Sequence, residues 1–408
     1  MRLDVYYYPF ILGVFAFMAD AYLSLGASSE KTDVKRAIEK IDRGLFAGAF
    51  CKIIDDPAGD PAWCAALHAD GAGTKSSLAY IKHRETGDFS AYYDLAQDSV
   101  VMNLDDLICV GATGGFVMSN TIGRNAHRVD GNAIKAIIEG YVGFIKKMGE
   151  LGIDITMSGG ETADVGDLVG TLIVDSTVFV RMKRCDVIDC GNIRPGDVIV
   201  GFSSSGQAAY EDKPNSGIGS NGLTAARHLL LSKYYAEKYP ETYSSTIDQS
   251  KVYSGKYLIT DTLPAGAGVP EMTVGDALLS PTRTYAPIVR DILAEGRSRI
   301  HGIIHCTGGG QLKCRAFGRG LHYVKDNLFE TPPLFDAIAE TGAISPREMF
   351  SVFNMGHRLE MYCEEAHAPS LIAAAEKYGV KAQVVGYVEA TEGENRVTII
   401  KDGKAFEY

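Results

Sequence analysis

Asp70-Gly71-Ala72-Gly73-Thr74-Lys75 follows an apolar run, residues 63–69, that is long enough to form a buried strand. The chain therefore leaves a strand and enters a glycine-rich turn. Two glycines let backbone N–H groups approach an anion closely, Lys75 adds a positive charge, and Asp70 offers a carboxylate to a divalent cation. A Walker A loop has glycine directly before its lysine, but Thr74 stands there. The stretch predicts a phosphate-handling loop of another type, with an ordinary turn as the alternative.

Composition narrows the class of protein. The chain has 408 residues, of which 46% are hydrophobic and 22% charged, and this length favours two domains. Its net charge of −11 argues against a broad surface for nucleic acid or an anionic membrane. Local positive charge and backbone amides must therefore hold any anionic substrate. The 8 cysteines include no C-x-x-C pair, which predicts reduced thiols in the cytoplasm rather than a zinc site or disulfides.

The N-terminus has two interpretations. Residues 5–19 are nearly all apolar but too short to cross a bilayer as a helix, and Arg2 is the one positive residue ahead of them. Ala19-Asp20-Ala21 has the form of a signal-peptidase site, which would indicate secretion. Met18 offers the other interpretation, a true start preceded by translated upstream sequence. The cysteine pattern favours the second, so we expect residues 1–17 to be an upstream extension outside the fold.

Helical and strand patterns alternate along the chain and predict a mixed α/β layered fold. Asp33 is placed to cap a helix carrying Val34, Ala37, Ile38 and Ile41, and Asp130 to cap one that ends near residue 150. Pro195-Gly196 breaks the chain, which predicts an N-terminal domain of residues 18–194 and a C-terminal domain of residues 195–408. Strands are expected at 153–157, 170–182, 198–202, 300–306, 359–363, 382–388 and 397–401, helices at 223–231, 283–294 and 370–378, and loops or insertions at 207–220 and 240–275.

Five further segments carry chemistry. They are Asp105-Asp106 among apolar residues, the run Ser158 to Asp164 after a predicted strand, and the runs 219–222, 280–285 and 305–310 in the second half. Adjacent aspartates are commonly a solvated helix start, and glycine pairs are commonly turns. Taken together, acids able to gather Mg²⁺ and several amide-rich loops predict a site for two phosphorylated ligands.

These motifs resemble, in order, the aminoimidazole ribonucleotide synthetase (phosphoribosylformylglycinamidine cyclo-ligase) family of an ATP-binding superfamily. The resemblance runs from about Ala37 to the C-terminus and includes D-G-A-G-T-K, the aspartate pair, G-G-E-T-A, S-N-G, P-T-R-x-Y, H-x-x-x-H-x-T-G-G-G at 301–310 and F-N-M-G at 353–356. It implies a homodimer in which N-terminal sheets pair into a barrel, each followed by a C-terminal α/β sandwich. Neither nucleic acid nor a membrane is an implied partner.

The implied reaction belongs to de novo purine biosynthesis. ATP, with Mg²⁺, phosphorylates the formyl oxygen of formylglycinamidine ribonucleotide, and ring closure gives aminoimidazole ribonucleotide. Such chemistry requires positioning and charge neutralisation more than a strong nucleophile, which is consistent with the lack of a Ser-His-Asp or Cys-His motif.

The resemblance also implies roles for individual residues. Asp70 and Asp106 match the acids that hold the metal, and Arg283 is the candidate for a contact to an anionic group. His305 either moves a proton or is a structural histidine bonded to a backbone carbonyl. The nucleotide-binding positions are Asp70, Gly71, Gly73, Thr74, Lys75, Gly159, Gly160, Glu161 and Thr162. The substrate-binding positions are Ser220, Asn221, Gly222, Thr307, Gly308 and Gly309, and the catalytic candidates are His305, Lys75 and Arg283.

Three departures from the family pattern fall near the substrate. Ser204-Ser205-Gly206 and Ser220-Asn221-Gly222 are separated by an insertion, with Gly219 where the pattern has histidine. Asp105 stands where asparagine is usual, and His357-Arg358 replaces Val-Gly.

Two alternatives remain open. One is another ATP-dependent enzyme of the superfamily, such as thiamine monophosphate kinase, selenophosphate synthetase or a hydrogenase-maturation protein. The other is a non-catalytic ATP-binding paralogue. ADP release that depends on formylglycinamidine ribonucleotide distinguishes the cyclo-ligase from both.

Overall fold

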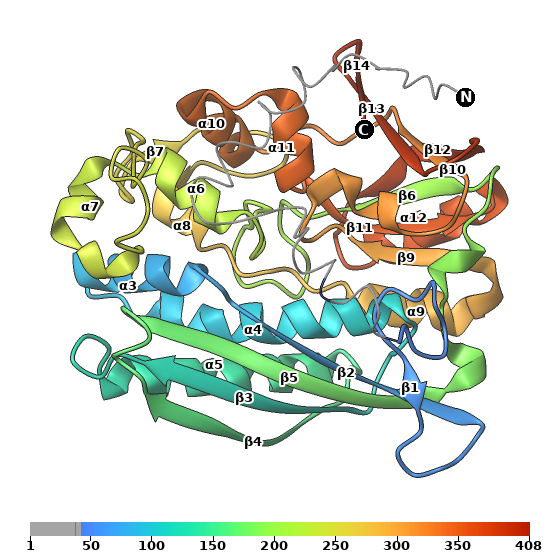
Figure 1. The fold of residues 1–408 in the computed structure, drawn as a ribbon, viewed down its shortest axis with the longest axis horizontal. Coiled ribbons are helices and arrows are strands. Elements are labelled where there is room, and N and C mark those ends of the chain that lie inside the picture. The colour runs from blue at the N-terminus through green and yellow to red at the C-terminus, as the bar shows by residue number, and fades with distance from the viewer. Residues whose placement is uncertain (1–36, 38–41) are drawn as a thin grey trace, which may run out of the picture.

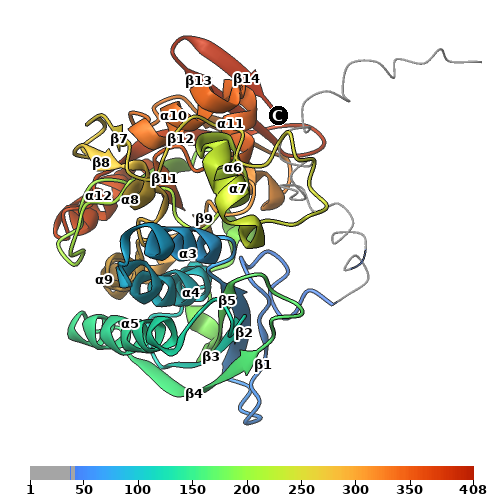
Figure 2. The same cartoon turned by 90° about the vertical axis from the view of Figure 1, so that its left-hand side faces the viewer.

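The structure, a computed structural model, describes residue 37 and residues 42–408. Its first sheet has the strand order β1-β2-β5-β3-β4. Strands β2, β3 and β4 run in the same direction, and β5 lies antiparallel between β2 and β3, so the carboxyl ends of β2, β3 and β4 meet at one edge. Figure 2 shows helices α4 and α5 along one face of this sheet. The strands are β1 Ile54–Asp55, β2 Trp63–Gly71, β3 Phe116–Arg124, β4 Ile155–Asp164 and β5 Leu172–Lys183.

The second half forms a seven-stranded sheet of order β14-β13-β10-β12-β6-β11-β9. Helix α12 packs on β6 and β12, and α9 packs on α12 (Figure 1). The strands are β6 Val198–Ser203, β9 Gly302–His305, β10 Leu321–Lys325, β11 His357–Cys363, β12 Ala382–Ala390, β13 Arg396–Lys401 and β14 Lys404–Glu407, with a small hairpin of β7 Thr262–Leu263 and β8 Met272–Thr273. The helices of the described chain are α3 Lys75–Thr86, α4 Ser90–Cys109, α5 Gly131–Glu150, α6 Leu223–Leu230, α7 Lys233–Lys238, α8 Val274–Leu278, α9 Ala286–Gly296, α10 Pro333–Gly342, α11 Pro346–Val352 and α12 Ala368–Glu376.

Most predicted elements are confirmed, with ends that differ by a few residues. The strand expected before the glycine-rich turn is β2, and the helix expected after Asp130 is α5. The Asp130 carboxylate accepts hydrogen bonds from the N–H groups of Asn132 (2.9 Å) and Ala133 (3.1 Å), as a helix cap should. The extension 1–17 lies outside the described residues, as does the helix expected after Asp33 apart from Ala37.

Residues 158–164 correct one prediction. They were expected to follow a strand, but β4 continues through them to Asp164, paired with β3 in parallel. The pairing shifts register between Met118 and Ser119, beside Gly159, whose φ of +141° only glycine adopts readily. Two adjacent glycines indicated a turn, whereas here they allow an irregular strand to continue. Most of this segment is solvent-exposed at the edge of the sheet.

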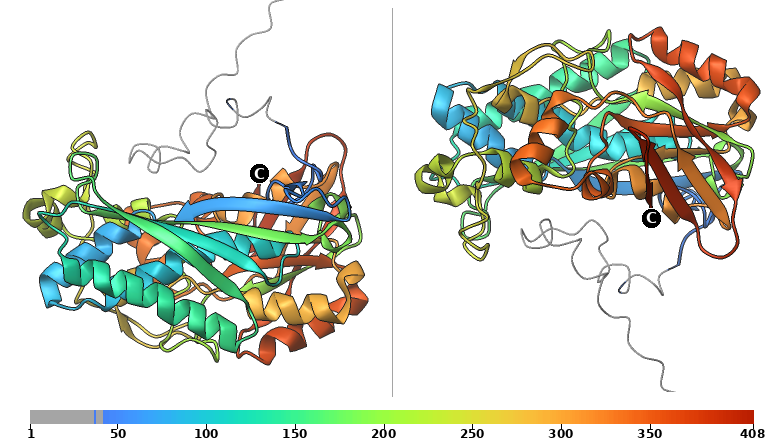
Figure 3. Two further views of the ribbon diagram at one scale, coloured as in Figure 1. Left: turned by 90° about the horizontal axis from the view of Figure 1, so that it is seen from below. Right: turned by 90° about the horizontal axis from the view of Figure 1, so that it is seen from above.

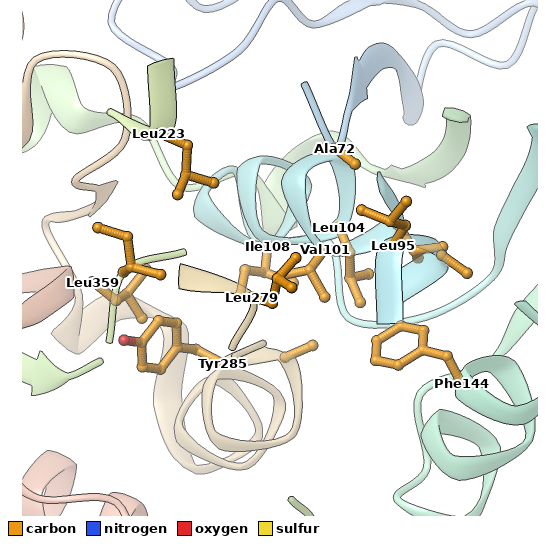
Figure 4. Close-up of a cluster of buried hydrophobic side chains, with 14 of the residues drawn as sticks. Ala72, Leu95, Val101, Leu104, Ile108, Phe144, Leu223, Leu279, Tyr285 and Leu359 are labelled. Carbon is orange, nitrogen blue, oxygen red and sulfur yellow. The ribbon is translucent and has the colours of Figure 1, made fainter. Parts of the chain in front are cut away.

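Helix α4 is the centre of the molecule. It packs against α5, β2 and β5 on one side and against α9 and β9 on the other, so nearly all of its faces are buried. Figure 4 shows Leu95, Val101 and Ile108 of α4 in one hydrophobic cluster with Leu279 and Tyr285 from the second half. The two halves therefore share a core. Because α4 is enclosed, Asp105 is buried near its end and Asp106 is partly buried there, rather than both being solvated at a helix start.

The described residues include no helix long and apolar enough to cross a membrane. All 8 cysteines fall within this part of the chain and are free thiols.

Candidate functional site

The N-termini of α3 and α6 face each other where the two halves meet. The hydroxyl of Thr74, directly before α3, lies 3.1 Å from that of Thr224 in the first turn of α6. Neither helix has a side-chain cap or an acidic residue in its first turn. Gly222 precedes α6 with a φ of +76°. Uncapped helix N-termini present N–H donors and partial positive charge to anions, and here two of them converge.

Polar side chains around these N-termini lack partners. Asn221 Oδ1 and Ser76 Oγ are enclosed and have no hydrogen-bond partner among the described residues. A Cβ at Gly308 would lie 4.0 Å from Asn221 Nδ2, so the loop of residues 306–310 approaches the loop that precedes α6. Enclosed polar atoms are nearly always hydrogen-bonded, and unpaired ones beside glycine-rich loops indicate a place for a polar ligand. The structure thus brings Thr74, Asn221 and the residues after Thr307 together, although they are far apart in sequence.

Lys75 is fully buried, and its charge is neutralised within the protein. Its Nζ donates to Asp98 Oδ1 at 2.6 Å and to the carbonyl of Ser280 at 2.7 Å. The same carboxylate oxygen accepts from the N–H (2.8 Å) and hydroxyl (2.5 Å) of Thr282 and from the hydroxyl of Ser220 (3.2 Å). Burial lowers the pKa of Lys75, and Asp98 opposes that shift. Lys75 therefore joins the glycine-rich loop to two loops of the second half and does not point into open space.

Three carboxylates on one stripe of α4 take donors from the second half. Positions 94, 98 and 105 lie on one face of a helix, because their spacings of four and seven residues return to the same side. Asp94 accepts from Lys213 Nζ at 2.5 Å, and Asp105 accepts from the Thr284 hydroxyl at 2.6 Å. The bonds of Asp98 and Asp105 dock α4 onto residues 280–285, and that of Asp94 docks it onto the insertion at 207–220.

Asp105 is expected to make stability depend on pH. Burial raises the pKa of this carboxyl to about 6, above the roughly 3.9 of an unfolded chain. Between these values the folded state holds the proton more tightly, so stability falls as pH rises through that window. Asp105→Asn lacks this titration and keeps an oxygen for Thr284. The unfolding free energies of both proteins are measured by urea titration. That of Asp105→Asn should rise relative to that of the parent protein between about pH 4 and about pH 6, and the difference between them should be constant above that range. A difference that does not vary with pH would contradict this account.

Asp106 lies between two histidines. Its Oδ1 accepts from His305 Nδ1 at 2.8 Å, and its Oδ2 is 3.2 Å from His68 Nε2. Burial alone would raise the pKa of Asp106, but the bonds from His305 and His68 outweigh it and hold that pKa well below its usual value. His68 also donates from Nδ1 to Asn103 Oδ1 at 3.0 Å. Burial lowers the pKa of His68, but the hydrogen bond to Asp106 prevails and raises it.

His305 is held at both ring nitrogens. Arg358 Nε donates to His305 Nε2 at 3.1 Å, which leaves the proton of the neutral ring on Nδ1, facing Asp106. The ring is fully buried. Its partners are thus a carboxylate and a guanidinium, and not the backbone carbonyl of the structural alternative.

Asp70 lies beside a second carboxylate that the motif did not include. Gly71 pairs with Asp175 across β2 and β5, and a Cβ at Gly71 would meet Asp175 Oδ1 at 1.7 Å. Burial raises the pKa of Asp175, and the charge of Asp70 raises it further. Asn103 Nδ2 donates to the backbone carbonyl of Asp70 at 3.1 Å and ties this loop to α4. The two carboxylates interact as charges, but Asp70 and Asp175 lie in consecutive rows, whose side chains project to opposite faces of the sheet.

The glycine pair of β4 is in register with this loop but not in contact with it. Asp70, Ser176, Asn120 and Gly160 form one row across the sheet, and Gly71, Asp175, Thr121 and Glu161 form the next. Three strand spacings separate β2 from β4, which is roughly 14 Å. Gly159, Gly160, Glu161 and Thr162 are therefore exposed at the far edge of the sheet, apart from the loop at residues 70–75.

Arg283 does not face an open cleft, which corrects its expected contact with an anionic ligand. Its Nε and Nη2 donate to the two carboxylate oxygens of Glu211, at 2.9 and 2.5 Å, and Nη1 donates to the carbonyls of Ser203 and Ser205. The side chain is 1% exposed. Glu211 belongs to the insertion at 207–220, so the insertion itself neutralises this arginine.

Sequence reasoning missed several polar residues of this region: His68, Asp98, Asp175 and Glu211. It noted Arg358 as a departure from the family pattern but gave it no role. For Asp98 a signal existed, since it lies seven residues before Asp105 and therefore on the same face of α4. Asp175 and Glu211 reach their partners only through strand pairing and tertiary packing, which no local pattern reveals.

Comparison with known proteins identifies the family. The family models described as AIR synthase related protein, N-terminal domain and C-terminal domain, match residues 51–182 and 194–399. The chain is 29% identical to the phosphoribosylformylglycinamidine cyclo-ligase of Methanococcus vannielii, over 86% of this chain and 84% of that protein. It is 30% identical to the protein of the same name from Symbiobacterium thermophilum, over 87% and 88% of the two chains.

Solved structures show the same fold at low identity. Phosphoribosylformylglycinamidine synthase II from Thermotoga maritima matches with a TM-score of 0.54 and 12% identity over 95% of this chain, which spans about half (50%) of that longer chain. A chain of the HypE–HypF complex matches with a TM-score of 0.54 and 13% identity, over 93% of this chain and 99% of its own length. The family matches on both halves confirm the resemblance seen in the motifs: the chain belongs to the AIR synthase related protein family.

Proposed function

We propose that this protein is a phosphoribosylformylglycinamidine cyclo-ligase, which uses ATP to close formylglycinamidine ribonucleotide into aminoimidazole ribonucleotide. The observation that carries the proposal is the meeting of two uncapped helix N-termini, one from each half, at the Thr74–Thr224 contact of 3.1 Å. A reaction between two phosphorylated ligands requires two anion-binding ends close together. The similarity to proteins of that name over most of their length supports the choice of reaction.

Within this proposal the first-half loop binds the nucleotide and the second-half loops bind the ribonucleotide. The amides of Gly73 and Thr74, for which no acceptor is found among the described residues, receive ATP phosphates. Lys75 acts by holding that loop against Asp98 and Ser280. Ser220, Asn221 and Gly222 face the ribonucleotide together with residues 307–309. Asn221 Oδ1, which has no partner among the described residues, is available for a substrate hydrogen bond. For Gly159 to Thr162, a nucleotide contact would have to come from the exposed face of the sheet.

The acids fit a magnesium ion in part. Asp70 is a carboxylate at the start of the loop, and Mg²⁺ commonly takes one or two carboxylates plus phosphate oxygens. The ion would neutralise charge on the phosphates of ATP. Asp106 is less suited as a ligand, because both of its oxygens are occupied by His305 and His68. We therefore assign Asp106 to positioning these two histidines and Asp70 to the metal.

The reaction requires no nucleophile from the protein. The terminal phosphoryl group of ATP moves to the formyl oxygen, and a nitrogen of the substrate then attacks the formyl carbon. The bond from that carbon to oxygen breaks, and the oxygen leaves with the phosphoryl group as inorganic phosphate. The products are aminoimidazole ribonucleotide, ADP, phosphate and a proton. What the protein supplies is alignment, exclusion of water and charge stabilisation.

We also propose that the chain forms a homodimer through its first sheet and acts in the cytoplasm. Within the described residues, α4 and α5 cover one face of this sheet, and the left view of Figure 3 shows the strands on its other face. On that face Leu67, Phe179 and Val117 form one row across three strands, and Leu67 is 62% exposed. An exposed apolar row on an open sheet is suited to burial against a second copy.

The test is ADP release by the purified protein with ATP and Mg²⁺, with and without formylglycinamidine ribonucleotide. The proposal predicts ADP only when the ribonucleotide is present, in equal amount to aminoimidazole ribonucleotide. Saturable ATP binding without turnover would indicate a binding paralogue. Phosphate transfer to another acceptor would indicate a kinase, and either result would overturn the proposal.

A further inference from the structure

Arg358 is a buried cation at the junction of the second-half loops. It lies in β11 beside His305 in β9, and its backbone carbonyl accepts from the N–H of Cys306 at 2.6 Å. The side chain is 2% exposed. Its Nε donates to His305 Nε2, its Nη2 donates to the carbonyl of Arg283, and its guanidinium lies 5.5 Å from the ring centroid of Tyr285.

The charge of Arg358 is incompletely satisfied. Among the described residues, no carboxylate forms an ion pair with it, and Nη1 donates no hydrogen bond. Asp105 interacts with it only as a nearby charge. Nη1 is not among the fully enclosed polar atoms that lack partners, so it borders accessible space. A buried guanidinium with unused N–H groups is costly unless a ligand completes its bonds.

Nη1 points at the loop that leads into α6. A Cβ at Gly219 would lie 2.8 Å from Arg358 Nη1, closer than two such atoms can approach. Gly219 also has a φ of +69°, which favours glycine. These are two of the positions at which the chain departs from the family pattern, histidine being replaced by Gly219 and glycine by Arg358. The guanidinium of Arg358 occupies the space that a side chain at position 219 would need.

We propose that Arg358 is a substrate-binding residue of this chain, whose Nη1 binds the phosphate group of the ribonucleotide at the loop of residues 219–222. This inference rests on the proposed function for the identity of the ribonucleotide. A guanidinium offers two N–H donors in the geometry of a phosphate, and the N-terminus of α6 adds backbone donors and partial positive charge. Nε continues to hold His305, so the same side chain connects substrate binding to the His305–Asp106 pair.

The test compares Arg358→Met, which removes the charge, with Arg358→Lys, which keeps it without the planar fork. Arg227→Met is the matched control, because Arg227 is also buried, bonds the carbonyl of Thr242 and lies over the ring of Tyr253. We expect Arg358→Met to raise KM for formylglycinamidine ribonucleotide by about 10- to 100-fold, and Arg358→Lys to raise it less. The Kd for ATP should stay within about twofold, and Arg227→Met should leave KM unchanged.

A second readout separates this inference from the proposed function. Inorganic phosphate should raise the melting temperature of the parent protein and of Arg227→Met, but not that of Arg358→Met. If the parent protein does not cyclise the ribonucleotide, the proposed function fails, and the phosphate response still tests Arg358. If Arg358→Met does not fold, Arg358→Lys carries the test and should bind phosphate several-fold more weakly.

Three results would overturn the inference. The first is a folded Arg358→Met protein whose KM and phosphate response equal those of the parent protein. An Arg358→Lys protein that binds phosphate as tightly as the parent protein would count in the same way. The second is a loss of ATP affinity in place of ribonucleotide affinity, which would assign the phosphate to the nucleotide. The third is an equal rise of KM in Arg227→Met. It would show that the loss of any buried arginine weakens substrate binding by destabilising the protein.

Discussion

Replacing Asp98 with alanine is expected to lower the free energy of unfolding by about 3–5 kcal/mol, because it leaves the buried ammonium of Lys75 without its carboxylate. The same substitution removes the acceptor for the N–H and hydroxyl of Thr282, two donors from the second half. Both losses fall at the contact between the glycine-rich loop and residues 280–282. The measurement is urea unfolding of the parent and variant proteins at neutral pH.

Two controls make this prediction specific. Asp94→Ala removes a carboxylate from the same stripe of α4, but its partner Lys213 is half exposed, so the cost should be about 1 kcal/mol or less. The double variant Lys75→Met, Asp98→Leu replaces the ion pair by apolar groups and should be more stable than Asp98→Ala. Equal effects of Asp94→Ala and Asp98→Ala would show that Lys75 is not held as described.

Replacing Asp106 with alanine is expected to reduce turnover by about 100-fold or more while the protein stays folded. The substitution removes the group that accepts from His305 Nδ1 and faces His68 Nε2, so both rings lose their orientation. Turnover is measured as ADP formed in the presence of formylglycinamidine ribonucleotide, and folding by circular dichroism and thermal unfolding.

Asp154→Ala is the control for Asp106, since this exposed carboxylate precedes β4 at the opposite end of that strand from the glycine-rich loop. It should retain parental turnover. Asp106→Asn keeps the size of the side chain but replaces one of the two oxygens that face His305 and His68 by an NH₂ donor, and we expect it to lose most of the activity as well. If Asp106→Ala turned over as fast as the parent protein, neither Asp106 nor the orientation of its two histidines would contribute to the reaction.

Much of the fold follows from local patterns. The apolar run before Asp70 predicts β2, Asp130 predicts the start of α5, and Pro195-Gly196 predicts the break before β6. These signals are local because strand burial, helix capping and turn formation involve neighbours in the chain. The motif order also predicted the family, which the matches to both halves confirm.

The electrostatics of the site could not be predicted in this way. Asp98 and Asp105 look like surface residues until α4 is enclosed on both sides, and only tertiary packing encloses it. Arg283 carries a motif, but its partner Glu211 lies 72 residues away in an insertion of little pattern. The glycine pair at residues 159–160 indicated a turn because pairing with β3, which keeps it in a strand, is not visible in sequence.

The most direct test of the proposed reaction follows one oxygen atom. Formylglycinamidine ribonucleotide labelled with ¹⁸O at the formyl group is incubated with the protein, ATP and Mg²⁺, and the released phosphate is analysed by mass spectrometry. Phosphorylation of the formyl oxygen predicts one ¹⁸O in each inorganic phosphate and none in water, with one ADP per aminoimidazole ribonucleotide. The account would be contradicted if ¹⁸O appeared in water. It would also be contradicted if aminoimidazole ribonucleotide formed while the released phosphate carried no ¹⁸O.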